Sequence, residues 1–228
     1  MSTTKWIIDP THSEVSFKVK HLVISTVTGY FRKFEGAAEV ASEDFNGATV
    51  SFTADIDSID TNQADRDGHL KSADFFDAGN YPKLSFEGKI ANNGGDYSLV
   101  GNLTMRGVTK EVELDVTFGG VVADPYGQTK AGFEIEGKIN RKDFGLTWSA
   151  ITEAGSVVVS DQVRLQFSIQ LLVFNDQSGA KAYYHELKKD EQIEFNMNPG
   201  ELIAIVSGKQ AIPYKSATES IVFCEIES

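Results

Sequence analysis

The chain has 228 residues, 33 of them acidic and 21 basic, which gives a net charge of −12. Binding to DNA, RNA or an anionic membrane surface needs clustered lysines and arginines, so this balance argues against all three. The one cysteine, Cys224, excludes a disulfide within the chain, and the four histidines show no metal-ligand spacing.

The N-terminal residues Met1–Trp6 contain no basic region followed by an apolar stretch, which a secretory signal requires. No run of the sequence is long and apolar enough for a transmembrane helix. We therefore expect a cytoplasmic protein. A periplasmic location is the alternative, for the case that a mature form was given a new initiator methionine.

Apolar and polar residues alternate along most of the first 173 residues, which is typical of strands with one dry face and one wet face. We predict that each strand turns its apolar set inward. In chain order, the sets are Val15, Phe17, Val19 and His21; Val50, Phe52, Ala54 and Ile56; Leu84 and Phe86; Tyr97, Leu99, Leu103 and Met105; Val112, Leu114, Val116 and Phe118; Phe133, Ile135 and Ile139; and Val163, Leu165, Phe167, Ile169, Leu171 and Val173.

Turn-forming residues separate these strands, at Asn46-Gly47, Asn93–Asp96, Arg106-Gly107 and Asp124–Gly127. Successive hairpins that share one dry face close most economically into an up-and-down barrel, because closure removes exposed sheet edges. The sequence therefore predicts an all-β, antiparallel barrel. A two-sheet sandwich is the alternative.

The segment Ser58–Asp77 interrupts the alternation and is too long and too rich in charged and aromatic residues for a simple turn. We predict a short helix here, capped by Asp60 and Thr61 and ended by Gly79–Pro82. Gly68 lies inside this helix and weakens it by about 1 kcal/mol relative to alanine. That weakness favours opening of the segment, or else the glycine permits close packing.

One apolar stripe of the predicted helix faces inward through Leu70, Ala73 and Phe76, which are spaced three residues apart. A short helix that carries aromatic residues between barrel strands is well placed to act as a lid. We expect Phe75 and Phe76 to close the entrance of the barrel.

A linker-like run at Asn175–Gly179 follows the last long strand, so we divide the chain into a barrel domain, 1–174, and a β-rich C-terminal extension, 175–228. An extension of this size is marginal as an independent fold. We expect it to dock on the barrel or on another subunit, for instance in a homodimer. Its predicted strand pieces are Tyr183–Leu187, Ile193–Met197, Leu202–Val206 and Val222–Ile226.

Four ordered blocks carry a resemblance to a known family. They are Trp6–His21, Ser58–Asp77 with Tyr81-Pro82, Gly101–Lys110, and Gly132-Phe133 with Asn140–Leu146. Over about residues 1–173 the chain resembles the YceI-like family of polyisoprenoid-binding barrels. The resemblance implies a lipocalin-like barrel of eight antiparallel strands that binds an isoprenoid lipid. The chain departs from the family pattern at Glu111, where many members have proline, and in its C-terminal extension.

The interior of an eight-stranded barrel is either just filled by side chains or holds one ligand, and the residues alone leave both possibilities open. The resemblance implies an elongated apolar pocket that is roofed by the lid. The expected apolar contacts of the ligand are Phe17, Val19, Phe31, Phe52, Phe75, Phe76, Phe86, Phe118, Phe133 and Trp148.

Three polar residues are candidates for contact with a ligand head group: His21, Arg66 and His69. Arginine suits an oxyanion and histidine suits a carbonyl oxygen as donor. For His21 the alternative is a histidine whose partners lie within the fold. For Arg66 the alternative is an ion pair that pins the helix to the barrel rim. The carboxylates considered for that pair are Asp60, Asp74 and Asp143.

The leading hypothesis is a non-enzymatic carrier or scavenger whose partner is an isoprenoid lipid or prenyl quinone, with no cofactor and no metal. The sequence contains no nucleophile elbow and no phosphate-binding glycine loop, and His185 begins a run that fails the zinc pattern because Lys189 occupies the second ligand position. One alternative is an enzyme that acts on an isoprenoid head group through Asp67, His69 or Asp143. The other is a solid barrel that serves structure or oligomerisation.

Overall fold

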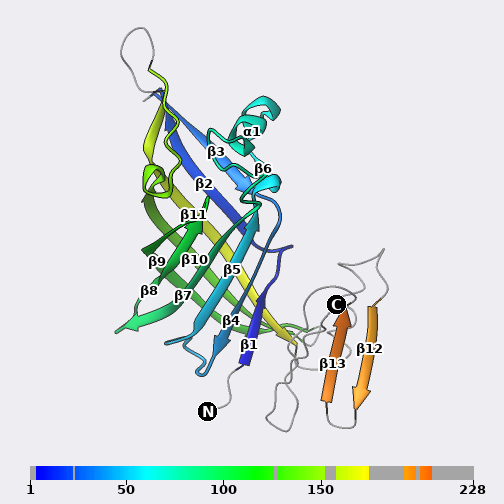
Figure 1. The fold of residues 1–228 in the computed structure, drawn as a ribbon. Helices are drawn as coiled ribbons and strands as arrows, with labels where there is room; N and C mark the ends of the chain where they lie inside the picture. The colour runs from blue at the N-terminus through cyan, green and yellow to red at the C-terminus, as the bar shows by residue number, and fades with distance from the viewer. Residues whose placement is uncertain are drawn as a thin grey trace.

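The computed structural model of the chain describes residues 4–22, 24–125, 128–151, 158–174, 193–198 and 201–206 (Figure 1). The strands in these ranges are β1 (Thr4–Ile8), β2 (Glu14–His21), β3 (Ser25–Phe31), β4 (Phe34–Val40), β5 (Thr49–Asp55), β6 (Ile59–Asp60), β7 (Lys83–Asn93), β8 (Asp96–Met105), β9 (Val108–Ala123), β10 (Gln128–Asn140), β11 (Val159–Phe174), β12 (Ile193–Asn198) and β13 (Glu201–Val206). The helices are α1 (Ala64–Lys71) and the 3-10 turns η1 (Ile56–Ser58) and η2 (Arg141–Phe144).

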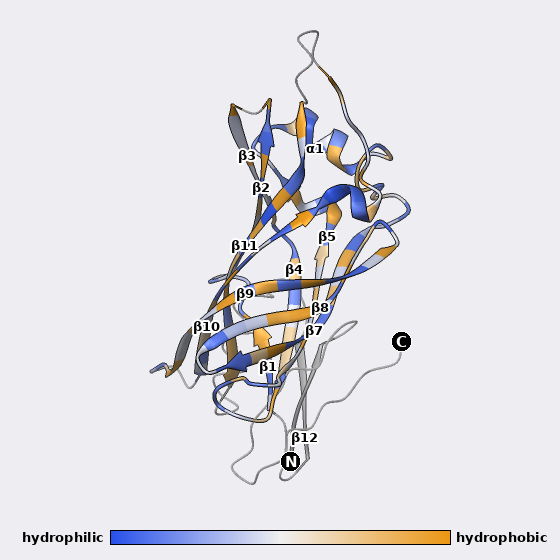
Figure 2. Cartoon of the chain, turned by 90° about the vertical axis from the view of Figure 1, so that its left-hand side faces the viewer, coloured by the Kyte–Doolittle hydropathy of each residue, from blue (hydrophilic) through white to orange (hydrophobic). Residues whose placement is uncertain are grey.

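Eight long strands form a closed antiparallel barrel, because three of them are each divided into two shorter strands. β1 continues into β2, β3 into β4, and β5 into β6. Each long strand pairs with the next along the chain, and β11 closes the barrel by pairing with β10 on one side and with β1 and β2 on the other. Hydrophobic and hydrophilic residues alternate along these strands (Figure 2). The predicted all-β antiparallel barrel is confirmed, and the sandwich is excluded.

Two predicted hairpin turns have the backbone geometry that their residues favour. Gly94 and Gly95 connect β7 to β8 with φ angles of 73° and 109°, and Arg106 and Gly107 connect β8 to β9 with φ angles of 48° and 73°. Two consecutive positive φ angles fit a type I′ turn, whose twist matches that of the paired strands. The side chain of Arg106 donates hydrogen bonds to the backbone oxygens of Gly145, after η2, and Ala73, in the turn after α1, which hold this non-glycine residue in place.

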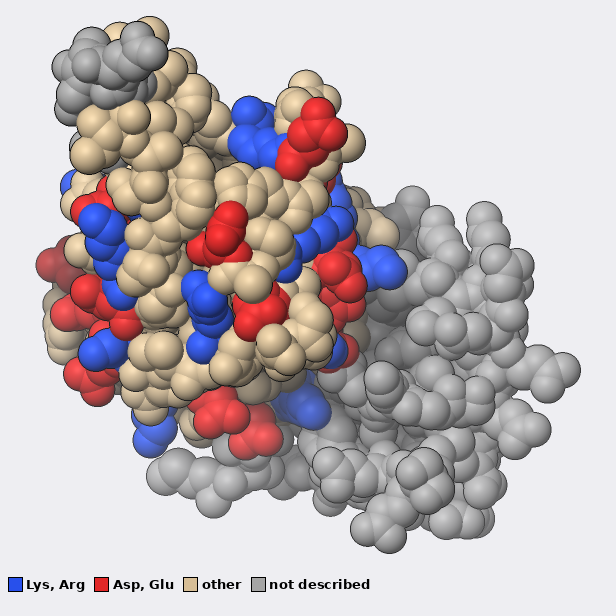
Figure 3. Space-filling model, turned by 45° about the horizontal axis from the view of Figure 1, so that its top comes forward, with Lys and Arg blue, Asp and Glu red and all other residues tan. Residues whose placement is uncertain are grey.

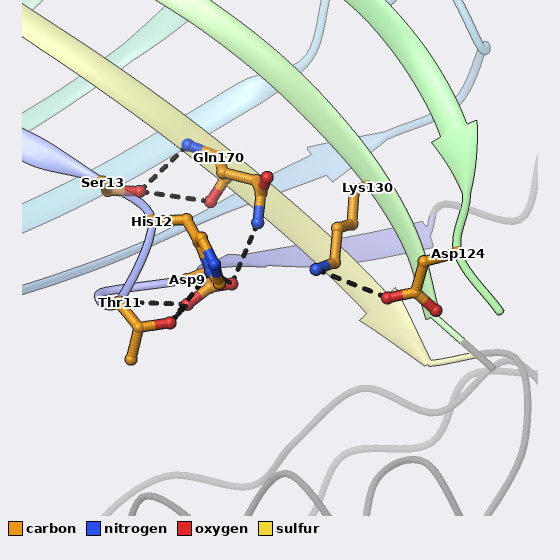
Figure 4. A network of polar contacts seen from close by, with 7 residues as sticks. All are labelled: Asp9, Thr11, His12, Ser13, Asp124, Lys130 and Gln170. Carbon is orange, nitrogen blue, oxygen red and sulfur yellow. Dashed lines mark hydrogen bonds and ion pairs between the residues drawn. The ribbon is translucent and has the colours of Figure 1, made fainter. Parts of the chain in front are cut away.

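Buried Asp9 holds the break between β1 and β2 (Figure 4). Its carboxylate accepts hydrogen bonds from the Thr11 hydroxyl at 2.6 Å and from Gln170 Nε2 at 3.0 Å, and His12 Nδ1 lies 2.8 Å away. Burial alone would raise the pKa of Asp9, but the hydrogen bonds from Thr11 and His12 outweigh it, so this pKa lies below its usual value. Since Gln170 is on β11, the network fastens this turn to the strand that closes the barrel.

Helix α1 is shorter than the predicted helix and has a different N-cap. It spans Ala64–Lys71, and the Gln63 side chain accepts a hydrogen bond from the backbone N–H of Arg66. The predicted caps were wrong because Asp60 belongs to β6 and Thr61 follows it directly, and both side chains are engaged by other residues. The helix therefore starts only after the chain has left the sheet.

The predicted inward stripe holds at two of its three positions. Leu70 is half-buried and Phe76 is buried, together with Phe75. Ala73 is exposed, because α1 ends at Lys71 and the chain then turns, with the Phe76 N–H donating to the Leu70 carbonyl at 3.0 Å. The two phenylalanines thus enter the barrel from a turn and not from the helix.

In the C-terminal extension, β12 and β13 form a two-stranded antiparallel sheet at two of the predicted strand positions. The predicted pieces Tyr183–Leu187 and Val222–Ile226, with His185 and Cys224, lie outside the described residues. The domain boundary at residue 174 stays a prediction. No helix in the described part of the chain has the length and hydrophobicity needed to span a bilayer.

Candidate functional site

An apolar cavity of about 340 Å³ lies inside the barrel. Its walls come from strands all around the barrel. The α1 segment, residues 61–77, also lines it, through Arg66, His69, Leu70, Phe75 and Phe76. Nine of the ten apolar residues expected from the sequence line it: Phe17, Val19, Phe31, Phe52, Phe75, Phe76, Phe86, Phe133 and Trp148. The structure therefore resolves the question that the residues alone left open, because the barrel is not filled by its own side chains.

Phe118, the tenth residue, is not among those that line the cavity; it belongs to an aromatic cluster beyond it. Its ring stacks on Phe133 with centroids 5.0 Å apart and contacts Phe45 at 5.5 Å and Tyr97 at 5.5 Å. Phe45 also contacts Trp6 at 5.2 Å. These rings close one end of the barrel, and Phe133 belongs both to this cluster and to the cavity wall.

Sequence reasoning missed Phe45, which is the centre of that cluster and 0% exposed. It lies in the loop between β4 and β5 and has a φ angle of 57°, an unusual value for a phenylalanine. The loop supports this conformation, because the Asp44 carboxylate accepts hydrogen bonds from the Ser42 hydroxyl and the Asn46 N–H. A residue that points inward from a loop has no alternating neighbours to reveal it.

The lid end of the cavity is held by aromatic contacts between the α1 segment and the barrel. The ring of Phe76 meets Phe31 edge-on at 6.1 Å. His69 meets both Phe75 and Trp148 edge-on, at 5.1 and 5.0 Å, and the latter two rings lie 5.2 Å apart. Edge-to-face contacts of this kind each stabilise by about 0.5–1.5 kcal/mol beyond their buried area. The predicted roofing by Phe75 and Phe76 has its physical basis here.

Arg66 lines the cavity and also pins the helix to the barrel rim. Its Nε donates to the Thr61 hydroxyl at 2.7 Å, and a terminal nitrogen donates to the Thr61 carbonyl at 2.6 Å. Among the described residues Arg66 forms no ion pair with a carboxylate, so the alternative considered for it was wrong about the partner. Asp60 pairs with Arg32 at 2.8 Å, and Asp74 lies 2.8 Å from His69. The anchor is therefore Thr61, a neutral residue that directly follows β6 and is itself buried.

His21, at the end of β2, also lines the cavity. Its side chain is half-buried, and the described residues provide no hydrogen bond to its ring. Its backbone carbonyl accepts from the Ser25 hydroxyl at 3.1 Å. Of the three predicted polar residues, His21 is thus the one whose ring nitrogens are open to a ligand, whereas His69 and Arg66 already have partners.

Arg141 is a cavity residue that the sequence did not single out by itself, although it lies in one of the resembling blocks. It is 4% exposed, and its guanidinium donates to the carbonyls of Leu146, Trp148, Val159 and Ser160 and to the Asp161 carboxylate. Burial lowers its pKa below the usual arginine value, and Asp161 offsets this only in part. The acceptors lie in the stretch after η2 and on β11, so Arg141 fastens these two segments together. Because they engage all three of its nitrogens, Arg141 is not free to bind an anion.

Comparison with known proteins places the chain in a family. The YceI-like domain model matches residues 6–171. A UPF0312 protein of Staphylococcus epidermidis is 36% identical over 173 residues, which are 75% of this chain and 99% of that protein. The solved YCEI protein of Campylobacter jejuni is 31% identical with a TM-score of 0.58, over 69% of this chain and 90% of that one.

A further solved structure shares the fold at lower identity. It is a polyisoprenoid binding domain from Saccharophagus degradans implicated in plant cell wall breakdown, 14% identical with a TM-score of 0.51, over 73% of this chain and 97% of that one. The family model covers most of the chain, and the Staphylococcus relative is covered almost completely. This chain therefore belongs to the YceI-like family.

Proposed function

We propose that this protein binds a long-chain isoprenoid lipid, of the polyprenyl or prenyl-quinone type, inside the barrel and sequesters or carries it. The observation that carries the proposal is the cavity, which is walled by aliphatic and aromatic side chains and covered by Phe75 and Phe76. Its volume falls within the range of about 300–1,000 Å³ that is common for ligand pockets. Membership of the YceI-like family, and the polyisoprenoid binding domain that shares its fold, support the same ligand class.

The hydrophobic effect is sufficient to drive this binding. Burial contributes about 0.8 kcal/mol per CH₂ group, so ten buried methylene equivalents contribute roughly 8 kcal/mol before the entropy of association is subtracted. Affinity then depends on how much of the prenyl chain enters the cavity. No charged group of the ligand has to be paired inside.

The polar residues that line the cavity determine which type of ligand head group can bind. Arg141 has no nitrogen left unpaired, so the described residues that line the cavity offer no vacant buried cation to a phosphate. His21 has an open ring and provides a hydrogen bond to a carbonyl or hydroxyl oxygen, such as that of a quinone. Arg66 and His69 lie at the lid and reach the head group by exchanging their present partners, Thr61 and Asp74. We assign the protein no catalytic step.

A pair of tryptophan substitutions on β10 tests the proposal. Ile135 points into the cavity, whereas Lys138 is exposed on the outer face of the same strand. Ile135→Trp fills part of the cavity, so we expect it to weaken binding of a prenyl quinone at least about tenfold, which corresponds to the loss of one or two buried CH₂ groups. Lys138→Trp adds the same ring outside the barrel and is expected to bind as the wild type does.

Binding is measured by co-elution of quinone absorbance with the protein and by native mass spectrometry. Both variants need a cooperative melting transition close to that of the wild type for the comparison to hold. If the wild-type protein retains no prenyl quinone or polyprenol in either measurement, the proposed function is wrong. Equal weakening in both variants would place the ligand outside the cavity.

A further inference from the structure

An aromatic layer closes one end of the barrel. We call it the floor and define it by Trp6, Phe45, Tyr97 and Phe118. The Phe45 ring lies 5.2 Å from Trp6 and 5.5 Å from Phe118. A further contact of 5.5 Å joins Phe118 to Tyr97. None of the four residues lines the cavity, but Phe133 does, and its ring lies 5.0 Å from both Phe45 and Phe118. The floor therefore lies directly behind Phe133.

The strands show that the barrel interior continues beyond the cavity. On β9, Val116 lines the cavity, whereas Phe118, two residues further along the same face, does not. On β11, Leu171 lines the cavity and Val173 does not, although Val173 is 3% exposed. Buried side chains thus continue past the cavity on both strands. The cavity ends at the floor because side chains fill the interior there.

The polar residues of the cavity lie at its other end. Val159, at the start of β11, pairs with His21, whereas Leu171, near the floor, lies close to the end of that strand. The helix α1, which carries Arg66 and His69, is at the His21 end of the barrel (Figures 1 and 2). Acidic and basic side chains are interspersed on the surface seen from this end (Figure 3). A ligand whose head group is hydrogen-bonded at this end points its apolar chain toward the floor.

A closed floor limits how far an isoprenoid chain can enter the barrel. A packed layer of buried rings leaves no gap for a methyl-branched chain. Each methylene group that leaves water and enters the cavity raises the affinity about fourfold. A methylene group beyond the length of the cavity stays in water, or else moves the head group away from its partners. Affinity therefore rises with chain length only up to a limit that the floor sets.

Phe45 is the floor residue that depends least on the strands. It comes from the loop between β4 and β5, whereas the other three residues of the floor belong to the paired strands β1, β8 and β9. Its backbone N–H donates to the Ser42 carbonyl at 3.0 Å, a bond that does not need the ring. Removal of the ring leaves empty space behind Phe133, so that Phe133 can tilt away and the cavity deepens.

We propose that Phe45 sets the maximum length of the isoprenoid chain that the barrel accepts. This inference rests on the proposed function and adds to it the residue that determines chain-length specificity. The ring acts from behind the cavity wall, through Phe133, and does not line the cavity itself.

The test compares the chain lengths of the quinones that the full-length protein binds. The protein is equilibrated with an excess of a mixture of prenyl quinones that share one head group and differ in the number of isoprene units. Bound quinones are extracted and quantified by chromatography and mass spectrometry. Because every variant meets the same mixture, differences in solubility among the quinones cancel in the comparison.

We expect Phe45→Ala to shift the most abundant bound quinone toward longer chains by at least about one isoprene unit. Two additional buried methylene equivalents are enough to raise the ratio of the longer quinone to the one that the wild type prefers by at least about tenfold. Phe45→Leu removes less of the side chain, so we expect a smaller shift in the same direction. It decides the outcome if Phe45→Ala lacks a cooperative melting transition.

Phe144→Ala is the matched control. Phe144 is 1% exposed and does not line the cavity. It lies in η2, and Arg106 links the adjacent Gly145 to Ala73 in the α1 segment, so this position is far from the floor. The substitution removes the same atoms from the core, and we expect the chain-length distribution to stay that of the wild type. A shift as large as that of Phe45→Ala would overturn the proposal, since any loosening of the core would then have the same effect.

The outcomes separate this proposal from the proposed function. Quinone binding with the same chain-length distribution in the wild type and in the folded Phe45 variants overturns the proposal and leaves the proposed function intact. A wild type that binds all lengths in the proportions of the mixture has no length limit, and this result also overturns the proposal alone. If the wild type retains no quinone of any length, the proposed function is wrong and the proposal falls with it.

Discussion

Two buried polar residues show how single side chains hold this barrel together. Arg141 joins the stretch after η2 to β11 through backbone carbonyls, and Asp9 joins the turn between β1 and β2 to Gln170 on the same strand. Both groups are charged and nearly inaccessible, and both are surrounded by partners, as burial of a charge requires. Their role is to fasten irregular segments to the closing strand.

Asp9 gives the stability of the protein a defined dependence on pH. Its pKa in the folded state lies below the usual value of 3.8, so its contribution is present above that value and is lost as the pH falls through the folded-state pKa. We expect Asp9→Asn to lower the free energy of unfolding by about 1–3 kcal/mol near neutral pH, because the amide replaces one acceptor with a donor. The difference from the wild type should shrink below about pH 4.

Urea unfolding at neutral and acidic pH measures this difference. Asp115→Asn serves as the control, because Asp115 is an exposed carboxylate on β9, and surface substitutions of this kind usually change stability by less than about 0.5 kcal/mol. A difference between Asp9→Asn and the wild type that stays constant from neutral to acidic pH would contradict the assignment of the lowered pKa to the folded state.

At the scale of elements, α1 has no fully buried residue. It is attached through hydrogen bonds of Arg66 and Asp67 with Thr61 and through the apolar contacts of His69 and Leu70. Segments with few buried contacts open at lower free energy than the core. A lid needs this property, since the phenylalanines that follow the helix must leave their positions for a ligand to enter.

Gly68 offers a direct way to change the stability of α1. A Cβ atom at this position would meet nothing within 4 Å, and the residue does not have a positive φ angle, so close packing does not explain the glycine. We expect Gly68→Ala to stabilise the helix by about 0.5–1 kcal/mol, which slows hydrogen exchange of the α1 amides about two- to fivefold. If opening of α1 admits the ligand, quinone uptake slows by a similar factor.

Gly79→Ala is the matched control for this experiment. Gly79 is also unobstructed and lacks a positive φ angle, but it lies in the loop after the helix. It therefore reports the effect of an alanine on the unfolded chain alone. Exchange in α1 that is unchanged by Gly68→Ala, or slowed equally by both substitutions, would show that the helix does not open as a separate unit.

At the scale of the whole molecule, closure of β11 on β1 and β2 makes the barrel complete within residues 4–174. We therefore expect deletion of residues 176–228 to leave a folded barrel that still binds a prenyl quinone. The free energy of unfolding should change by less than about 1 kcal/mol, and the melting temperature by no more than about 4 °C. Melting, quinone co-elution and the mass in solution are measured together. A smaller assembly with intact quinone binding would assign the extension to oligomerisation, and loss of the cooperative transition would show that the barrel depends on it.

The alternation of residues in Val15–His21, the glycine pairs in the hairpins and the four family blocks were enough to predict the closed antiparallel barrel. These signals are local: a period of two places side chains on one face whatever the rest of the chain does. The same rule placed Phe17, Phe52 and Phe86 correctly on the inner face.

Only the tertiary structure decided whether the barrel is hollow and which residues meet its cavity. Phe118 lies on the same face of β9 as the alternating residues that point inward, but it does not line the cavity. At that end of the barrel, Phe45 enters from the loop between β4 and β5 and packs against Phe118. The hydrogen-bond acceptor of Arg66, and the acceptors that use every guanidinium nitrogen of Arg141, include carbonyls that folding brings together from other segments. Alternation determines the face of a strand on which a residue lies, whereas the space inside depends on how side chains from eight strands and two loops fill one cross-section.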